Sequence, residues 1–161
     1  MLKAATLGFL LLCITGMTGY SQQYMHSTSK VYVLRLKPHE DLKKAIMTFA
    51  RENNIKAGII LTCVGSLEQF NIRYANQPNG SKSNGHFEIV SLVGTFSDSS
   101  SHIHISISDK TGKTLGGHLL DENLIYTTAE IAVAEITDVS FSRETDSTYG
   151  YKELVISPKK D

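Results

Sequence analysis

The sequence predicts an α+β fold, in which a mainly antiparallel (mixed) sheet of about seven or eight strands packs with one main helix. Three observations support this fold class. Most of the chain divides into short segments rich in β-branched and aromatic residues, many with strict apolar–polar alternation. Only one clear segment repeats apolar residues at helical spacing. The chain has 161 residues and no internal repeat, which predicts a single domain.

The first strand and the helix come early. The segment VYVLRL at 31–36 predicts a strand. A helix is expected to open at Pro38 and to end near Asn53, with Glu40 and Asp41 in its first turn, where the helix dipole favours acids. Its apolar positions are Leu42, Ile46, Phe49 and Ala50.

The next segments predict a buried strand, a break and a second strand. Residues 57–64 form a continuous apolar run, typical of a central strand, and Gly65 and Ser66 are expected to end it. Residues 66–75 alternate, which would place Leu67, Gln69, Asn71 and Arg73 on one face and Glu68, Phe70, Ile72 and Tyr74 on the other. The turn-rich segment 76–85 predicts a loop that could border a pocket.

The second half of the chain predicts further strands. Strands are expected at 86–96, 102–109, 114–120 and 124–136, and in the segments VSFSRE and YKELVIS, which flank a polar loop at 144–150. Residues 109–113 read as a hairpin turn, which pairs the strands on either side of it. The segment 124–136 also has helical propensity, but its alternation favours a strand.

Residues 1–21 have the layout of a secretory signal peptide. A basic residue, Lys3, precedes an apolar run from Leu7 to Ile14 and then small and polar residues, with cleavage expected near Gly19–Ser21. The run is shorter than the roughly 20 apolar residues of a membrane-spanning helix, so no stable membrane span is expected. A buried N-terminal helix is the alternative. The signal peptide predicts a secreted or periplasmic protein with a flexible linker at 22–29 and one domain at 30–158.

The two cysteines have no predicted catalytic role. Cys13 follows three leucines, whereas a small residue is expected before a lipidated cysteine, so a lipoprotein is not favoured. Cleavage would leave Cys63 alone, which excludes an internal disulfide. Its apolar surroundings, AGIILTCVG, predict a buried and unreactive thiol.

The histidines of HIHISISDKTGKTLGGHLL are the candidate metal ligands. In a strand, His102 and His104 share a face, and Ile103, Ile105 and Ile107 fill the other. Imidazoles about 7 Å apart along a strand can converge on one ion. With the turn near 111–112, His118 falls nearly opposite His104 and completes a three-histidine set suited to zinc or another divalent metal.

Other interpretations of these residues remain open. The three histidines could be half-exposed residues on a polar strand face, because an H-x-H pattern alone is a weak signal. Gly116 and Gly117 would allow a backbone or a ligand to approach closely. His86 is a weaker candidate for a fourth ligand, and His26 and His39 have no predicted role.

The order of motifs resembles the PPC domain, the plants and prokaryotes conserved domain, also called domain of unknown function 296. The resemblance spans residues 30–142 and is most specific in GHFEIVSLVG and in the H-x-H…G-G-H-L hairpin. It implies a PPC-like α+β fold, a homotrimer, and a metal, usually zinc, held by the residues matching His102, His104 and His118. Members of this family in plants carry AT-hooks, but this chain lacks an R-G-R-P sequence.

Three functions are compatible with these features. The first is an exported trimeric metal-binding protein of undefined biochemical role, with a possible small-molecule ligand. The second is a metal-dependent hydrolase or lyase, in which Glu88, Asp121 or Glu130 would act as the general base. The third, DNA binding, rests on family analogy alone. The formal net charge of zero gives no reason to expect a nucleic-acid partner.

Overall fold

The computed structural model describes residues 26–159. The predicted signal peptide therefore lies outside the described residues. The elements are the strands β1 (Ser29–Leu36), β2 (Gly58–Arg73), β3 (Ser81–Phe96), β4 (Ser101–Ser108), β5 (Thr114–Leu119), β6 (Leu124–Ile136), β7 (Val139–Thr145) and β8 (Lys152–Pro158), and the helix α1 (Leu42–Glu52).

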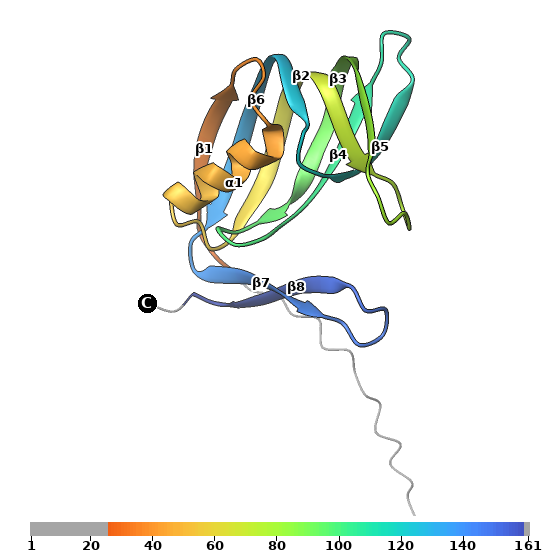
Figure 1. The fold of residues 1–161 in the computed structure, drawn as a ribbon. Helices are drawn as coiled ribbons and strands as arrows, with labels where there is room; N and C mark the ends of the chain where they lie inside the picture. Colours follow the sequence, from red (N-terminus) through yellow and green to blue (C-terminus); the bar gives the residue numbers. More distant parts are fainter. Residues whose placement is uncertain (1–25, 160–161) are drawn as a thin grey trace, which may run out of the picture.

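Six strands form the main sheet, in the order β1-β6-β2-β3-β4-β5, and β7 and β8 form a separate hairpin. Every pairing is antiparallel, so the predicted α+β class is confirmed and the sheet contains no parallel pair among the described strands. In Figure 1 the helix α1 covers the sheet near β1 and β6, and the β7–β8 hairpin lies below it. The strand preferred for 124–136 is confirmed as β6.

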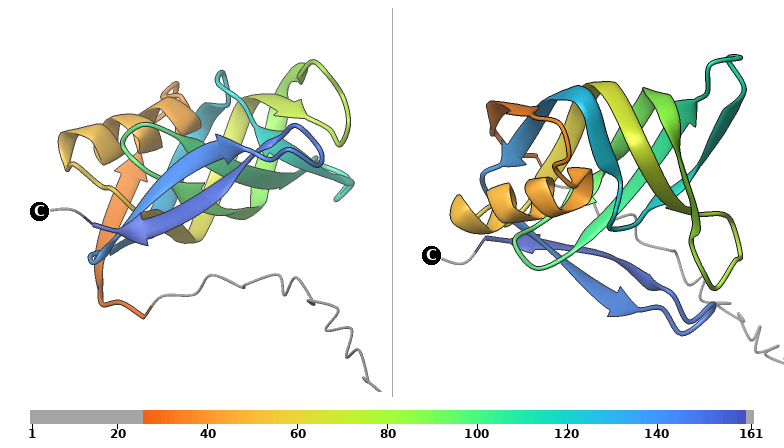
Figure 2. Two further views of the ribbon diagram at one scale, coloured as in Figure 1. Left: turned by 90° about the horizontal axis from the view of Figure 1, so that it is seen from below. Right: turned by 45° about the horizontal axis from the view of Figure 1, so that its top comes forward.

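The main sheet curls so that its edge strand, β5, also pairs with β2, a central strand of the sheet. β5 pairs with β4 along its length and also with the end of β2, where Ile72 faces Leu119 and Arg73 faces His118. The two views in Figure 2 show this curvature. The end of β2 is thereby brought beside the histidine hairpin, although the two segments are far apart in the sequence.

β2 is one long strand, so the break predicted at Gly65 and Ser66 is wrong. Irregularities in its pairing with β6 replace the break and bend the strand. The shift between Leu67 and Gln69 occurs in the pairing with both neighbours. Leu67 is fully buried, contrary to the prediction that it shares a face with Gln69, because the irregularity turns its side chain to the core.

The predicted loop 76–85 is shorter than expected. β3 begins at Ser81, and its first residues pair with the end of β2, Ile72 with Ser81 and Gln69 with Asn84. Residues 81–85 are therefore part of a strand because they pair with β2, although their composition favours a turn.

α1 begins later than predicted. Its N-cap is Asp41, whose Oδ1 accepts a hydrogen bond of 3.1 Å from the Lys44 amide, so neither Asp41 nor Glu40 lies in the first turn. The predicted apolar face packs on the sheet, with Leu42, Ile46 and Ala50 buried. The helix ends at Glu52, as expected from the asparagines that follow.

The core contains the buried face of β4 and the thiol of Cys63. Ile103, Ile105 and Ile107 are buried, as the alternation predicted. Cys63 is 5% exposed, and burial raises the pKa of its thiol to about 12. The expectation of a buried cysteine is confirmed, and the raised pKa disfavours the thiolate, which is the reactive form. No helix in residues 26–159 is long and apolar enough to span a membrane.

The turn between β5 and β6 is fixed by the side chain of Asn123, which is fully buried. Its Nδ2 donates to the carbonyl oxygens of Asn71 at 2.9 Å and Leu120 at 2.7 Å, and its Oδ1 accepts from the Asn71 amide at 3.0 Å. Asn71 lies in β2, so one side chain joins this turn to the middle of the sheet.

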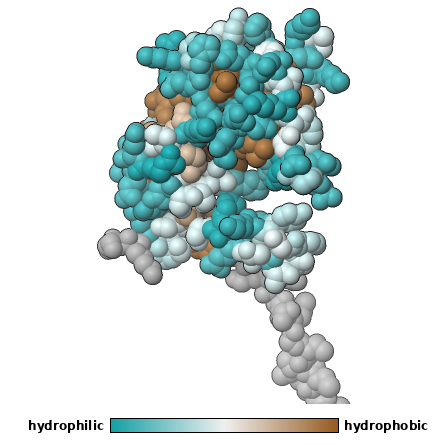
Figure 3. Space-filling view, viewed as in Figure 1, coloured by the Kyte–Doolittle hydropathy of each residue, from teal (hydrophilic) through white to brown (hydrophobic). Residues whose placement is uncertain are grey.

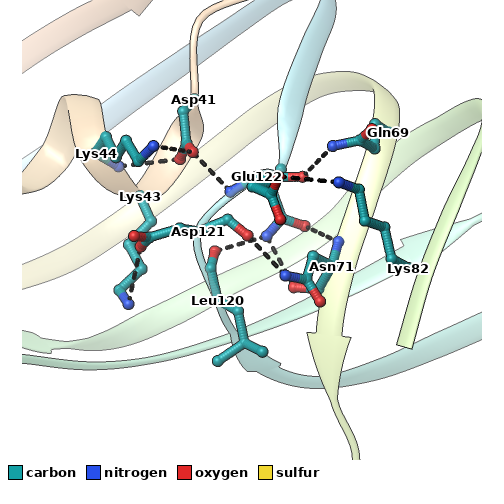
Figure 4. Close-up of polar contacts among 10 residues, drawn as sticks. Asp41, Lys43, Lys44, Gln69, Asn71, Lys82, Leu120, Asp121 and Glu122 are labelled. Atoms are coloured by element: carbon teal, nitrogen blue, oxygen red, sulfur yellow. Dashed lines mark hydrogen bonds and ion pairs between the residues drawn. The ribbon is translucent and has the colours of Figure 1, made fainter. Parts of the chain in front are cut away.

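Ionic and polar contacts surround the same turn (Figure 4). Asp41 Oδ2 accepts from the Glu122 amide at 2.6 Å, and Lys82 pairs with the Glu122 carboxylate at 2.9 Å. Lys43 of α1 pairs with Asp121 at 3.1 Å. The segment that follows His118 is therefore held by the helix and by two strands.

Candidate metal centre

The hairpin of β4 and β5 brings the three predicted histidines together. His102 and His104 project from β4 on the face opposite its buried isoleucines, and His104 pairs directly with His118 of β5. The predicted register of the hairpin is therefore confirmed. The hairpin turn is closed by Asp109, whose Oδ1 accepts from the Thr111 amide and hydroxyl and from the Lys113 amide, and these bonds lower the pKa of the Asp109 carboxyl.

The imidazole nitrogens converge at distances that suit a metal ion. His104 Nε2 lies 3.2 Å from His102 Nε2 and 3.1 Å from His118 Nδ1. One nitrogen from each ring lies within 4.8 Å of the other two. Ligands on a tetrahedral zinc ion with bonds of about 2.0–2.1 Å are about 3.3 Å apart. The two short separations are close to that value, so the donor set fits zinc in both its chemistry and its spacing.

Burial and nearby positive charges favour the neutral form of two of these rings, which is the form that binds metals. Burial lowers the pKa of His118 to about 4, with smaller contributions from Arg73 and from the other two histidines. Burial is also the largest cause of the lowered pKa of His102. The charges of Arg143 and His104 lower this pKa further, while Glu153 raises it.

A metal-free arrangement is also chemically consistent with this geometry. Nitrogen separations of 3.1–3.2 Å allow a hydrogen bond, in which His104 Nε2 donates to or accepts from one neighbouring ring at a time, depending on its tautomer. The rings of His102 and His118 stack, with centroids 5.1 Å apart and planes 17° apart. The polar-face interpretation therefore remains the alternative that a metal measurement must exclude.

The glycine before His118 is required by the curl of the sheet. A Cβ on Gly117 would lie 2.5 Å from the carbonyl oxygen of Arg73 and 3.0 Å from Ile72 Cγ2. The predicted close approach of another backbone at this glycine is thus confirmed, and that backbone is the end of β2. Gly117 thereby lets β2 approach the strand that carries His118.

The remaining histidines lie elsewhere. The ring of His86 stacks on Tyr126 with a centroid distance of 4.0 Å and is not part of the cluster, so the weaker expectation of a fourth ligand is wrong. His39 Nδ1 lies 2.6 Å from a carboxylate oxygen of Glu68. Stacking and ion pairing explain both side chains without a metal.

The three candidate bases differ in their positions. Glu88 faces Ser108 at the other end of β4, and Glu130 lies in β6 opposite Arg35, so neither is brought to the cluster by its strand. Asp121 lines the same cavity as His102 and His118, but its carboxylate is paired with Lys43. Of the three candidates, Asp121 is therefore the one placed near the histidines.

A cavity of about 940 Å³ has His102 and His118 in its wall. Its other walls come from α1, from the segments around the ends of β2 and β5, and from the β7–β8 hairpin. Sequence reasoning missed two of its residues, Arg73 and Arg143, which act on the pKa of the histidines. Only the long-range pairing of β2 with β5 and the placement of the C-terminal hairpin bring them there.

The fold and the candidate site together describe a small α+β domain. Its antiparallel sheet is curled, it has one helix among the described residues, and one hairpin carries three clustered histidines. The family model for the Plants and Prokaryotes Conserved (PCC) domain matches residues 24–137. The chain therefore belongs to this family, and the resemblance inferred from its motifs is confirmed.

Individual proteins are also similar to this chain in sequence or in fold. A hypothetical protein from Salmonella enterica is 35% identical with a TM-score of 0.83, over 86% of this chain and all of the other. A metal-containing protein from Archaeoglobus fulgidus is 27% identical with a TM-score of 0.69, over 83% of this chain and 99% of that one. The bifunctional protein GlmU of a Synechococcus strain is 42% identical over 80% of this chain, which spans 20% of that relative's length.

Proposed function

We propose that this chain is an exported PCC-domain protein that assembles as a homotrimer and holds one zinc ion with His102, His104 and His118. The convergence of three imidazole nitrogens, at 3.1 and 3.2 Å for two of the pairs, is the observation that carries the proposal. The basic, apolar and small segments of residues 1–21 support export to the periplasm or the medium. The balanced charge gives no support for a nucleic-acid partner.

The metal assignment also has support from the surroundings of the cluster. The neutral state of His118 at pH 7 follows from its pKa of about 4 and makes its lone pair available to a metal. A structural relative is described as metal-containing. Three histidines are a ligand set found at catalytic zinc sites, which hold a fourth position for water or substrate.

Replacement of His104 tests the metal assignment. We expect His104→Ala to lose the bound metal, because His104 Nε2 is the nitrogen that lies close to both other ligands. His39→Ala is the matched control, since His39 contacts Glu68 and not the cluster. Metal per chain is measured by inductively coupled plasma mass spectrometry after gel filtration. Equal metal content in the two variants would disprove the assignment.

The exposed apolar residues support self-association. Val31 and Val33 of β1 are 60% and 80% exposed, and Val64 of β2 and Val93 of β3 are 56% and 52% exposed. Val93 pairs with His104, so the histidine face of the sheet carries part of this apolar surface. On the face shown in Figure 3, hydrophilic residues predominate and apolar areas are small. Contact with further copies of the chain would remove these side chains from water.

Light scattering after gel filtration tests the assembly. We expect the exported chain to have three times its monomer mass, and Val93→Asp to lower that mass because a charge would be buried in the contact. Lys110→Asp, at the exposed hairpin turn, is the control. A monomer mass for the unaltered protein would contradict the trimer.

A second candidate, a metal-dependent hydrolase or lyase, is favoured by the cavity beside the histidines. A zinc ion there would supply a Lewis acid at the wall of a space large enough for a small substrate. Asp121, which lines this space, would need to leave Lys43 to act as a base. Turnover of an ester, phosphoester or amide by the zinc-loaded protein, absent in His104→Ala, would support this candidate.

A further inference from the structure

We propose that the cavity beside the histidine cluster binds a small organic anion, a carboxylate or a phosphate monoester, through the guanidinium groups of Arg73 and Arg143. This inference goes beyond the proposed metal site and does not depend on it, because both arginines carry their charge whether or not a metal is bound.

The cavity has an excess of positive charge. Six basic side chains line it, against the two carboxylates of Asp121 and Glu153. Asp121 is already paired with Lys43 at 3.1 Å, which offsets part of its charge. Among the residues that line the cavity, Glu153 is therefore the one carboxylate left to neutralise Arg73 and Arg143.

Arg73 ends β2 and faces His118 across the seam with β5. Its side chain is half-buried, and its one hydrogen bond to the described residues runs from Nη1 to the carbonyl of Gln77, at a long 3.3 Å. It makes no ion pair within residues 26–159. Arg73 and His118 line the same cavity, which places the guanidinium beside the cluster.

Arg143 of β7 also lines the cavity. It is half-buried, and Nη2 donates to the Thr95 hydroxyl at 2.8 Å. Thr95 faces His102 in the β3–β4 pairing, so this bond fixes the guanidinium beside His102. No carboxylate of the described chain lies within ion-pair distance of it, although Glu153 is close enough to raise its pKa against the effect of burial.

An anion is the ligand that suits this arrangement of charges and donors. Taking a guanidinium partly out of water is unfavourable unless an anion or hydrogen-bond acceptors replace the solvent. Each guanidinium has five N–H donors in a planar fork, and the hydrogen bonds recorded use one donor from each. The unused donors match the two oxygens of a carboxylate or a phosphate.

The rest of the cavity favours an organic anion over an inorganic one. Met47 of α1, Leu119 and Leu120 contribute apolar surface to the wall. A volume of about 940 Å³ is at the upper end of the range for small-molecule sites and exceeds the space that a single inorganic ion needs. An apolar body could therefore cover these side chains while its charged group contacts the arginines.

Isothermal titration with three probes tests the inference. The probes are phenyl phosphate, benzoate and inorganic phosphate, added to full-length protein in metal-free and in zinc-loaded form. We expect at least one of the two aromatic anions to bind metal-free protein and to bind about tenfold more tightly than inorganic phosphate, since the ring adds apolar contact. Which aromatic anion binds better distinguishes a phosphate ligand from a carboxylate ligand.

Arginine variants identify the groups responsible. Arg73→Gln and Arg143→Gln are each expected to weaken binding about tenfold, because each loses a charge-assisted hydrogen bond. Arg35→Gln is the control, since Arg35 lies on β1 and bonds Thr128 away from the cavity. Circular dichroism confirms that each variant is folded, and Arg143→Lys, which keeps the charge but not the fork, should lose affinity as well.

Three outcomes would overturn the inference: no binding of either aromatic anion, binding that no arginine variant weakens, or an affinity for both aromatic anions no higher than that for inorganic phosphate. Binding that requires zinc and ignores both arginines would mean that the anion is only a metal ligand, in which case the metal proposal stands and this one fails. If the anion binds through the arginines to a protein that retains no zinc, this inference stands and the metal proposal fails.

Discussion

Replacing Asn123 with alanine is expected to lower the free energy of unfolding by about 3 kcal/mol, because its hydrogen bonds to three backbone groups are lost at once. The Asn71 amide and the carbonyls of Asn71 and Leu120 are bonded to this fully buried side chain. The side chain of alanine offers no donor or acceptor to replace these bonds.

Urea denaturation followed by circular dichroism measures this effect, and a fall in melting temperature of roughly 10 °C should accompany it. The control is Asn84→Ala, which removes an exposed asparagine of β3 and should change stability by less than about 0.5 kcal/mol. A loss below about 1 kcal/mol for Asn123→Ala would show that the turn between β5 and β6 is held by its other contacts.

Valine in place of Gly117 is expected to cost about 3 kcal/mol of stability and to weaken metal retention as well. The added Cβ would lie 2.5 Å from the Arg73 carbonyl oxygen, and backbone cannot move aside as a flexible side chain can. β2 and β5 would have to separate, which would break the pairing of Arg73 with His118. The two losses have one cause, because this pairing positions His118.

The control for this variant is Thr114→Val, which puts valine at an exposed position of the same strand. Both proteins are compared by denaturation and by metal per chain. If Gly117→Val kept native stability and native metal content, the contact between β2 and β5 would not be a determinant of the site.

The histidine hairpin could be predicted because its information is local. Alternation placed His102 and His104 opposite three buried isoleucines, and the position of the turn gave the pairing of His104 with His118. The fold class was predictable for the same reason, since each strand and the helix carry their own periodicity.

The irregular features of β2 could not be predicted in this way. Leu67 is buried because the strand pairing shifts between it and Gln69, and no residue pattern indicates such a shift. Similarly, Ser81 joins β3 because β2 is long enough to pair with it, although its neighbours have the composition of a loop.

The cavity could not be predicted because it is formed by segments distant in sequence. Arg73 reaches the site through the closure of β2 on β5, and Arg143 through the placement of a hairpin that pairs with neither. Residue type alone can also mislead. His86 is a histidine, as the candidate ligands are, but its ring stacks on Tyr126. Residue type and local alternation identify candidates, while long-range packing determines which of them meet.

The central claim is that the three histidines hold a metal ion. Metal content per chain tests it most directly, on protein purified from its export compartment without chelator, beside a variant with His102, His104 and His118 all changed to alanine. We expect about one equivalent of zinc per chain in the unaltered protein and none in the variant. Metal-free protein in both preparations would contradict the claim, and the cluster would then be a polar face of β4 and β5.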